Sequence, residues 1–461
     1  MSKRILILGA GVSGLSAGIL LAQKGHTVTL IEKSKEAGGL AKTIRCKNLH
    51  LDLGPHSLID HHPEVTKWLQ QILPQTLKQL PERKVRFSFR RKLLRYPLRP
   101  LDLLSKLPLT SWILVMKDMI QVAFFKNQSK EAQEKSVESW AISSFGQHLY
   151  DCFFKPYTEQ FWKMPANQLS ARSIPSHTRL SFQNAWKLLF QNKKASSATS
   201  QEREKLAHYY PDFGYGDIPD ALCHQLMNAG GTLKLQTEAI ALQKTKQGWQ
   251  VETKNENNSE LSAYDVVIST IPIPALFKIL EPQDAVIMSH AEYLRYRPIL
   301  VLGIHTRQTD LLGSDFYRYY LNRPYNRIFD TSRFSTKTCP PNTSMLGLEI
   351  PIHSPLAISP DPKILFESCK EALKEDLSLK EEEILDLTYA YSEDAYPIYR
   401  LNYQFSLRKI QNHIQSLGNL FLHGRTGKFC YMDADECMLE SIHLANGIKM
   451  DSATPQEILN S

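Results

Sequence analysis

Three glycines near the start of the chain have the spacing of a phosphate-binding turn. Gly9, Gly11 and Gly14 form the pattern G-x-G-x-x-G, and Glu32 follows further along. In such a pattern the first glycine permits a tight turn, the second lets backbone approach a pyrophosphate, and the third lets a helix pack closely on a strand. The acidic residue accepts hydrogen bonds from ribose hydroxyls and disfavours a 2′-phosphate. We therefore expect a bound dinucleotide other than NADP.

The residues around these glycines have the periodicity that the turn requires. Residues 4–8 (RILIL) predict a strand buried on both faces, residues 15–25 have helical spacing, and residues 27–31 (TVTLI) predict a second strand that ends at Glu32. The uncharged run 5–22 also resembles a signal peptide or a membrane helix in hydropathy. The functional spacing of the glycines favours the nucleotide-binding unit instead.

Length and composition exclude several classes of protein. A chain of 461 residues is too long for one compact core, which predicts two or more lobes. The net charge of +8 favours anionic ligands or an acidic surface. The seven cysteines include no C-x-x-C pair, which argues against a disulfide framework and favours a reducing cytoplasm. We expect no metal, because metal-ligand spacing is lacking among His50, His56, His61 and His62.

Two further motifs after Glu32 carry a family resemblance. The pair Gly38–Gly39 follows the acid closely, and Asp52-Leu53-Gly54-Pro55-His56 comes next. Here the chain resembles the FAD-dependent amine oxidase and protoporphyrinogen oxidase superfamily, and within it the UDP-galactopyranose mutase-like branch. The resemblance implies non-covalent FAD, with the glycine pair and the D-x-G-P-H segment against the flavin. It leaves two interpretations of His56, a functional group at the flavin face or a ring that hydrogen-bonds backbone below it.

The resemblance extends to the middle of the chain. Tyr157-Thr158-Glu159, Trp162, Arg172 and Arg179 are similar to a region that caps the flavin and lends arginines to an anionic substrate. This chain departs from that pattern at Gln160-Phe161, where Lys-Gln is usual, and at Lys163, where glycine is usual. The departures weaken any transfer of an exact substrate.

The C-terminal third also resembles the family. The backbone near residues 238–240 is expected to contact adenine, and Gly424–Arg425 is expected beside the flavin. A helix that opens at Asp433 and Asp435 would direct its N-terminus at the flavin pyrimidine edge. The candidate catalytic residues are therefore His56, Arg172 and Arg179. The candidate cofactor-binding residues are Gly9, Gly11, Gly14, Glu32, Gly38, Gly39, Gly54, Pro55, His56, Ile240, Gly424, Arg425, Asp433 and Asp435.

These motifs predict an α/β fold with a Rossmann-like FAD-binding domain assembled from discontinuous segments. We expect that domain to comprise residues 1–60, 206–275 and 410–455. Residues 61–205 and 276–409 would form a substrate-binding lobe of mixed helical and β-sheet structure. Within it, residues 191–205 are polar and predict a mobile loop.

Two surface features suggest partners. Residues 83–99 hold eight basic residues with aromatic residues between them, and could bind an anion or form a solvated hairpin with inward aromatics. No nucleic-acid-binding module accompanies this charge, so we expect no nucleic acid. Residues 112–125 are apolar but interrupted by Lys117 and Asp118, so they cannot span a bilayer and could lie on one as a peripheral contact.

Three functions fit the motifs. The leading one is an oxidoreductase whose flavin N5 accepts a hydride from a small molecule, with an external electron acceptor because only one dinucleotide motif is present. The second is a sugar-nucleotide mutase in which reduced flavin attacks the anomeric carbon through N5 and arginines hold the diphosphate. The substrate would be a porphyrinogen or an amine for the oxidoreductase and a sugar nucleotide for the mutase. The third is a flavin-free protein resembling GDP-dissociation inhibitors, which the intact glycines argue against.

Overall fold

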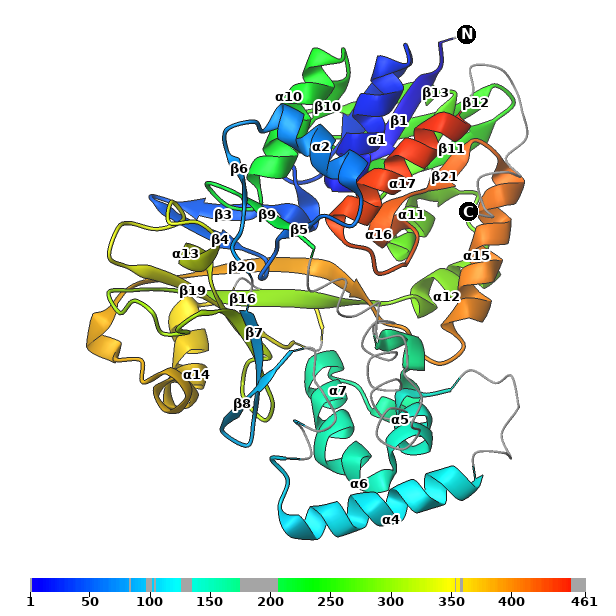
Figure 1. Cartoon of the computed structure of the whole chain (residues 1–461). Coiled ribbons are helices and arrows are strands. Elements are labelled where there is room, and N and C mark those ends of the chain that lie inside the picture. Colours follow the sequence, from blue (N-terminus) through cyan, green and yellow to red (C-terminus); the bar gives the residue numbers. More distant parts are fainter. Residues whose placement is uncertain are drawn as a thin grey trace.

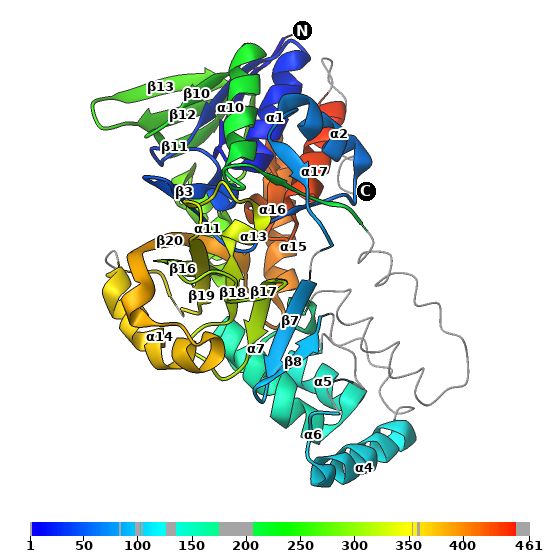
Figure 2. The ribbon, with the colours of Figure 1, turned by 60° about the vertical axis from the view of Figure 1, so that its left-hand side comes forward.

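The computed structural model describes residues 2–82, 84–96, 102, 105–125, 135–174, 206–352, 354–356 and 360–448. Arg179 and the predicted mobile loop 191–205 lie outside these residues. Figures 1 and 2 show a parallel sheet with its helices at one end of the molecule, a long and mostly antiparallel sheet in the middle, and a group of helices at the other end.

A five-stranded parallel sheet gathers strands from distant parts of the chain. Its order is β10 (Thr232–Lys234), β2 (Thr27–Ile31), β1 (Arg4–Leu8), β14 (Val266–Ser269) and β21 (Leu420–Leu422). The predicted strands 4–8 and 27–31 are confirmed. The predicted helix 15–25 is present as α1 (Val12–Gln23), which begins earlier because it starts directly within the glycine-rich turn.

The two faces of β1 bury alternate side chains in different cores. Ile5 and Ile7 pack with helices, whereas Leu6 and Leu8 pack on the opposite face, as the period of two in a strand requires. The helices on the first face are α1, α2 (Pro63–Ile72), α10 (Asp217–Asn228) and α17 (Ala434–Gly447). The second face is covered by a smaller sheet of β13 (Ser259–Tyr264), β12 (Gly248–Lys254), β11 (Glu238–Thr245) and β15 (Leu280–Glu281), with helices α11 (Ile273–Ile279), α12 (Ala285–Tyr293) and α15 (Tyr403–Leu417).

A seven-stranded sheet forms the middle of the molecule. Its order is β20 (Ile384–Pro397), β16 (Tyr296–Thr306), β19 (Ser344–Ile350), β18 (Arg327–Asp330), β17 (Asp315–Tyr320), β7 (Lys84–Phe89) and β8 (Lys92–Arg95). Helix α14 (Pro362–Leu377) packs on this sheet. The basic segment contains the hairpin β7–β8, with Phe87 and Phe89 buried as the solvated-hairpin interpretation predicts.

Short strands join the two large sheets. They are β3 (Thr43–Cys46) with β4 (Leu49–Asp52), and β5 (Leu58–Ile59) with β9 (His208–Pro211) and β6 (Leu77–Gln79). The predicted boundary at residue 410 falls inside α15. We keep the two-lobe division as a proposal, because the parallel and seven-stranded sheets draw on different segments of the chain.

The helices at the far end share one apolar core with the hairpin. They are α4 (Leu109–Phe125), α5 (Val137–Phe145), α6 (Gln147–Leu149), the π-helical turn Tyr150–Phe154 and α7 (Lys155–Trp162). In the part of the chain that the structure describes, no helix is long and apolar enough to cross a membrane.

Candidate functional site

The glycine-rich turn connects β1 to α1 at the carboxyl end of the parallel sheet. A Cβ atom on Gly14 would lie 2.1 Å from the carbonyl oxygen of Gly9, so only glycine lets the helix approach the strand this closely. A Cβ atom on Gly11 would meet nothing within 4 Å. The turn is therefore closed at Gly14 and open at Gly11, which is the arrangement that a pyrophosphate needs.

Glu32 braces this turn from the end of β2. Its Oε2 accepts the N–H of Ala10 at 2.9 Å, and its Oε1 accepts the N–H of Ser34 at 2.9 Å. Each oxygen keeps a further acceptor position, because a carboxylate oxygen has two lone pairs. The carboxylate can thus hold the loop and still accept from a ribose hydroxyl, a bracing role that the sequence motif did not predict.

Two other predicted segments lie against the same turn. The Gly38 N–H donates to the Ala10 carbonyl at 2.8 Å, and Gly11 and Gly38 form an isolated parallel bridge. The Thr237 N–H donates to the Glu32 carbonyl at 2.9 Å, which brings the start of β11 beside the acid. Ile240 follows as the extra residue of a β-bulge in β11, with a side chain that is half-exposed.

The C-terminal segment closes on the first turn of α1. A Cβ atom on Gly424 would lie 2.1 Å from Ser13 Oγ, and Gly424 begins the short helix α16 (Gly424–Gly427). Glu440 on α17 accepts the Gly424 N–H at 3.0 Å and also contacts His423 Nδ1 at 3.2 Å and Lys428 Nζ. Burial opposes ionisation of this carboxyl, but His423 and Lys428 lower its pKa to about 2. This anion fixes the position of the Gly424–Arg425 backbone.

Arg425 lies between two tyrosine rings. Its guanidinium carbon is 4.2 Å from the centroid of Tyr431 and 5.1 Å from that of Tyr396, and these rings are nearly parallel. It donates to the carbonyl oxygen of Ala395 at 2.9 Å, and its buried Nε has no partner among the described residues. No described carboxylate pairs with it, so Arg425 adds a net positive charge here.

The two aspartates at the start of α17 have local partners. Asp433 is the N-cap in a capping box with Glu436, so part of the helix N-terminus is satisfied by its own side chain. Asp435 is buried, and its Oδ2 lies 3.3 Å from His61 Nδ1. A direct role of either aspartate at a cofactor stays a proposal.

His56 lies where the two large sheets meet. A Cβ atom on Gly54 would be 3.5 Å from His56 Nε2 and 3.9 Å from Arg327 Nη2. Burial, together with the positive charges of Arg327 and Arg425, lowers the pKa of His56 to about 3. Its buried Nδ1 has no partner among the described residues. The ring is therefore neutral at ordinary pH and has an unsatisfied polar atom.

The Asp52 carboxylate holds the backbone behind His56. Asp52 accepts from Thr43 Oγ1 at 2.5 Å, from the Tyr210 hydroxyl at 2.6 Å and from the Tyr215 N–H at 3.2 Å. The ring of Tyr215 then lies 5.2 Å from the ring of His56. Burial raises the pKa of Asp52 to about 6, although these donors favour the ionised form. Asp52 thus positions the D-x-G-P-H segment.

A buried charge network from the seven-stranded sheet faces His56. Glu349 accepts from Arg297 Nη2 at 3.0 Å and from Arg327 Nε at 2.6 Å, and Arg327 Nη2 donates to the Tyr396 hydroxyl at 3.1 Å. Arg297 and Glu349 are almost completely inaccessible to solvent. Two guanidinium groups share one carboxylate, so the network carries an excess positive charge. Sequence reasoning missed Arg297, Arg327 and Glu349 because no local motif connects them.

Aromatic rings border the same network. Tyr317 and Tyr319 point to one face of β17, with rings 5.6 Å apart, while Tyr320 packs on Tyr325 on the other face. Arg327 lies 5.7 Å from the Tyr319 ring. Burial raises the pKa of Tyr319, so its hydroxyl stays protonated.

The departures at 160–163 have structural explanations. Gln160 Nε2 donates to the carbonyls of Tyr320 and Tyr325 at 3.1 and 3.2 Å, and Gln160 Oε1 accepts the Asn322 N–H at 2.7 Å. This amide ties α7 to the turn after β17. Lys163 ends α7 with a φ of 52°, a left-handed conformation that explains why glycine is usual there.

The predicted arginines of the middle segment do not lie in this network. Arg172 is exposed in the 3₁₀ turn Ala171–Ser173, and its guanidinium contacts the side-chain oxygen of Gln404 on α15. Arg179 lies outside the described residues. The basic groups that the structure brings to His56 are instead Arg327 and Arg425. Among the described residues there is no cluster of histidine, cysteine and carboxylate groups that could hold a metal.

The arrangement of a parallel sheet beside a separate, mostly antiparallel sheet is shared with solved structures. The chain is similar to a reduced UDP-galactopyranose mutase, with a TM-score of 0.80 at 20% identity over 97% of this chain and 95% of that chain. It is also similar to a putative protoporphyrinogen oxidase from Exiguobacterium sp. 255-15, with a TM-score of 0.73 at 16% identity over 97% and 99% of the two chains.

The chain belongs to the flavin-containing amine oxidoreductase family, whose model matches residues 12–428. It is 23% identical over 330 residues to protoporphyrinogen oxidase 2 of Arabidopsis thaliana, an alignment that covers 65% of this chain and 64% of that relative. It is 42% identical over 69 residues to an L-amino-acid oxidase of Crotalus adamanteus, which covers 15% of this chain and 13% of that relative. The chain thus spans less than two thirds of the length of these relatives.

Proposed function

We propose that the chain binds FAD without a covalent link and oxidises a small anionic organic substrate. The observation that supports FAD binding is the open position at Gly11. It lies next to the close approach of α1 to β1 at Gly14 and to Glu32, whose carboxylate accepts a backbone N–H group of the turn. Gly11 and Gly38 would hold the pyrophosphate, Glu32 the ribose, and residues 238–240 the adenine. Bound FAD would supply the hydride acceptor for the oxidation.

The residues around His56 are suited to an anionic substrate beside that cofactor. Arg327 and Arg425 bring more positive charge than Glu349 neutralises, and buried charges act strongly because little water screens them. This charge would hold a carboxylate or phosphate and stabilise negative charge that develops on reduction. Neutral His56 would orient the substrate through Nδ1 without adding a charge.

Aromatic side chains would shape the rest of the substrate site. Tyr317, Tyr319 and Tyr396 come from strands β17 and β20, and their phenol hydroxyls can donate hydrogen bonds. Their faces fit the flat or apolar part of a substrate, while their hydroxyls select its polar edge. Dry aromatic walls also exclude water from the reacting atoms.

A sugar-nucleotide mutase is the second candidate, supported by the structural similarity to a reduced UDP-galactopyranose mutase. In this case the excess charge at Arg327 and Arg425 would hold the diphosphate. The departure at Gln160 counts against an identical substrate, because its amide is committed to β17 and the following turn.

An anaerobic titration of the purified, flavin-loaded protein distinguishes the two candidates. Protoporphyrinogen, amino acids and amines would be added to the oxidised protein, and UDP-galactose to the oxidised and the dithionite-reduced protein. An oxidoreductase loses the absorbance of oxidised flavin when its substrate is added. A mutase shows no net electron transfer and binds UDP-galactose more tightly when reduced. A protein that retains no FAD at all contradicts both.

A further inference from the structure

Helix α4 places apolar side chains on the side that faces away from the protein. Ser111 and Val115 are buried against the helical core. The opposite side of the helix carries Leu109, Ile113, Met116 and Ile120, which are 80%, 68%, 45% and 56% exposed. These positions recur at helical spacing and form one stripe, here called the α4 face. An ordinary surface helix has the reverse pattern, with polar residues outward.

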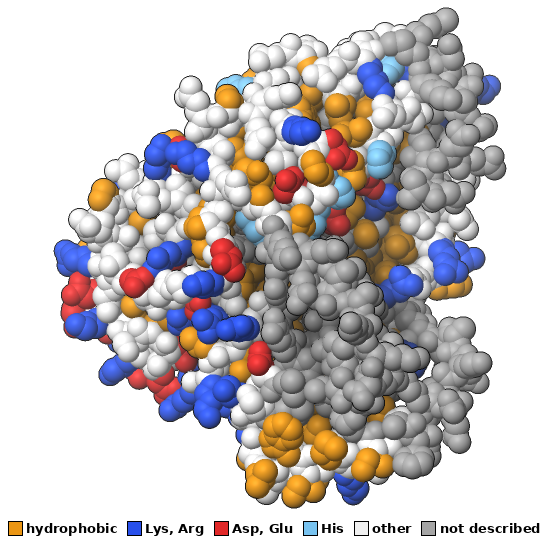
Figure 3. All heavy atoms as spheres, in the orientation of Figure 1, with side chains coloured by type: hydrophobic (Ala, Val, Ile, Leu, Met, Phe, Trp, Pro, Cys, Tyr) orange, Lys and Arg blue, Asp and Glu red, His pale blue; other side chains and the backbone are white. Residues whose placement is uncertain are grey.

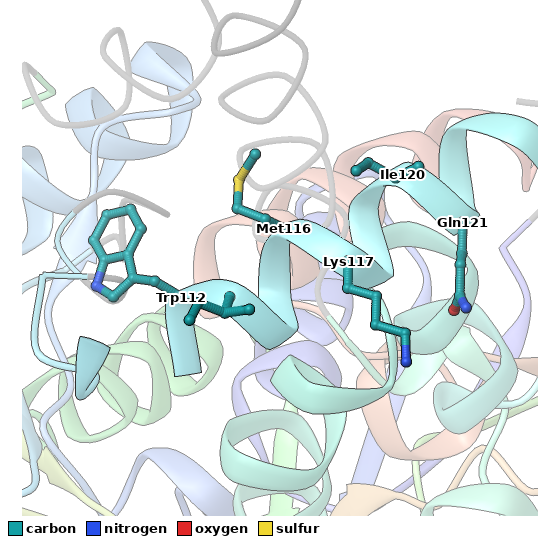
Figure 4. Close-up of a pocket in the computed structure, with 6 residues that line it drawn as sticks. Trp112, Met116, Lys117, Ile120 and Gln121 are labelled. Carbon is teal, nitrogen blue, oxygen red and sulfur yellow. The ribbon is translucent and has the colours of Figure 1, made fainter. Parts of the chain in front are cut away.

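Of the two charged residues of α4, the cationic one lies next to the α4 face and the anionic one does not. Asp118 Oδ2 accepts the N–H of His148 at 2.7 Å, so its carboxylate is turned toward the protein. Lys117 is exposed and, with Trp112, Met116, Ile120 and others, lines a shallow hollow on the helix (Figure 4). Figure 3 shows the apolar side chains gathered at the lower end of the molecule.

A basic hairpin lies next to the helical core that α4 covers. Figures 1 and 2 both show β7–β8 at the edge of the seven-stranded sheet, on the side toward α4 and away from the parallel sheet. Phe89 and Leu94 of the hairpin belong to the same apolar core as Val115 of α4. The hairpin exposes Lys92, Leu93 and Arg95 to solvent, and no described carboxylate pairs with Lys92 or Arg95.

We propose that the α4 face and this hairpin bind the surface of an anionic phospholipid bilayer. The apolar stripe would enter the boundary between headgroups and acyl chains, while Lys117, Lys92 and Arg95 would contact lipid phosphates. A second copy of the chain would be a poorer partner, because pairing through this end would bring like charges together. The helix would lie in the plane of the membrane, since no described helix can cross it.

This proposal does not depend on the proposed enzymatic function. The α4 face lies in the helical lobe, remote in the fold from the glycine-rich turn (Figure 1). Flavin content therefore serves as an independent check that a variant has kept its fold. The charge of this end also predicts that binding weakens as salt concentration rises, because salt screens exposed charges.

Co-sedimentation of the purified full chain with lipid vesicles tests the proposal. We expect binding to vesicles of equal parts phosphatidylglycerol and phosphatidylcholine to be at least ~10-fold tighter than to phosphatidylcholine alone. The double variant Ile113→Asp/Ile120→Asp should lose at least ~10-fold in affinity, because it places charge in the apolar stripe. The matched control is Leu261→Asp/Val286→Asp, which alters two equally exposed apolar residues elsewhere and should bind as the unaltered protein does.

A second variant keeps the test decisive if the first one misfolds. Lys92→Glu/Arg95→Glu should bind anionic vesicles at least ~10-fold more weakly, since each basic residue near the surface contributes about fivefold. The proposal is overturned if the unaltered protein does not bind anionic vesicles, or if folded variants bind equally well. A dimer that Ile113→Asp/Ile120→Asp dissociates, without vesicle binding, would assign the α4 face to a second copy instead.

Discussion

The glycine-rich turn and the arginine network behind His56 meet at one site but are built in opposite ways. The turn is made of backbone groups and one carboxylate, with Gly14 packed against the Gly9 carbonyl and Glu32 bonded to backbone N–H groups. The network is made of long charged side chains from several strands, centred on Glu349. The first should therefore be sensitive to side-chain size, and the second to side-chain charge.

The largest effect is expected from added volume in the turn. Gly14→Val would place a side chain inside contact distance of the Gly9 carbonyl, so α1 could not dock on β1. We expect a loss of at least ~3 kcal/mol in unfolding free energy, or no folded protein. Urea denaturation followed by circular dichroism measures it. The matched control is Gly11→Ala, whose Cβ enters open space and should leave the unfolding midpoint nearly unchanged.

Charge removal in the network should have the next largest effect. Glu349→Gln keeps the side-chain volume but leaves Arg297 and Arg327 buried without an anion. We expect a loss of about 3–5 kcal/mol in unfolding free energy. The control Glu375→Gln removes a half-exposed partner of Arg91 and Arg323 and should cost about 1 kcal/mol or less. Equal losses in the two variants would contradict the distinction between the buried network and the surface pairs.

Asp52 holds the backbone next to His56, and the effect of replacing it should depend on pH. Its folded-state pKa of about 6 is above that of an unfolded aspartate, so the folded protein binds this proton more tightly. The stabilisation from protonation is complete below the unfolded pKa and disappears as pH rises through about 6. Between pH 7 and pH 4 this amounts to about 2–3 kcal/mol. The free energy of unfolding should therefore depend differently on pH in the unaltered protein and in Asp52→Asn across this window. Parallel curves would contradict a raised pKa of Asp52 in the folded protein.

The smallest effect is expected for His56, whose ring should not change its protonation state near neutral pH. Burial and the two nearby arginines keep its pKa at about 3, so its ring should stay neutral from pH 5 to 8. Nitrogen NMR of protein labelled at histidine, with His56→Gln used to assign the signal, measures this directly. A His56 signal that titrates near neutrality would show that Arg327 and Arg425 do not act on it as described.

The same contrast decides how much of the molecule the sequence alone could predict. The strands around Gly9 and the helix after them follow from local periodicity, and the structure confirms them. Glu349 bonds to Arg297, 52 positions away, and Arg327 bonds to Tyr396, 69 positions away. Such pairs arise only when β16, β18, β19 and β20 assemble, so no local spacing indicates them.

Side-chain roles within a recognised motif were also hard to predict. The motif indicates the segment Asp52–His56, but the hydrogen bonds that Asp52 accepts from Tyr210 and Tyr215 depend on tertiary packing. Arg172 was expected near the substrate because of the family pattern, yet the structure places it on the surface beside Gln404. The motifs therefore predicted the local structure around the glycine-rich turn better than the surroundings of Arg172.

The most direct test of the central claim is the flavin content of the purified protein and of Gly11→Val, measured by absorbance after incubation with FAD and removal of the excess. The Cβ atom of the valine would enter the open position, where it meets no atom within 4 Å. We predict about one FAD per unaltered chain, released by denaturation because it is not covalent, and at least ~10-fold weaker binding by a folded Gly11→Val. An unaltered protein that retains no flavin, or a Gly11→Val protein that retains all of it, would contradict the assignment of the glycine-rich turn as the FAD site.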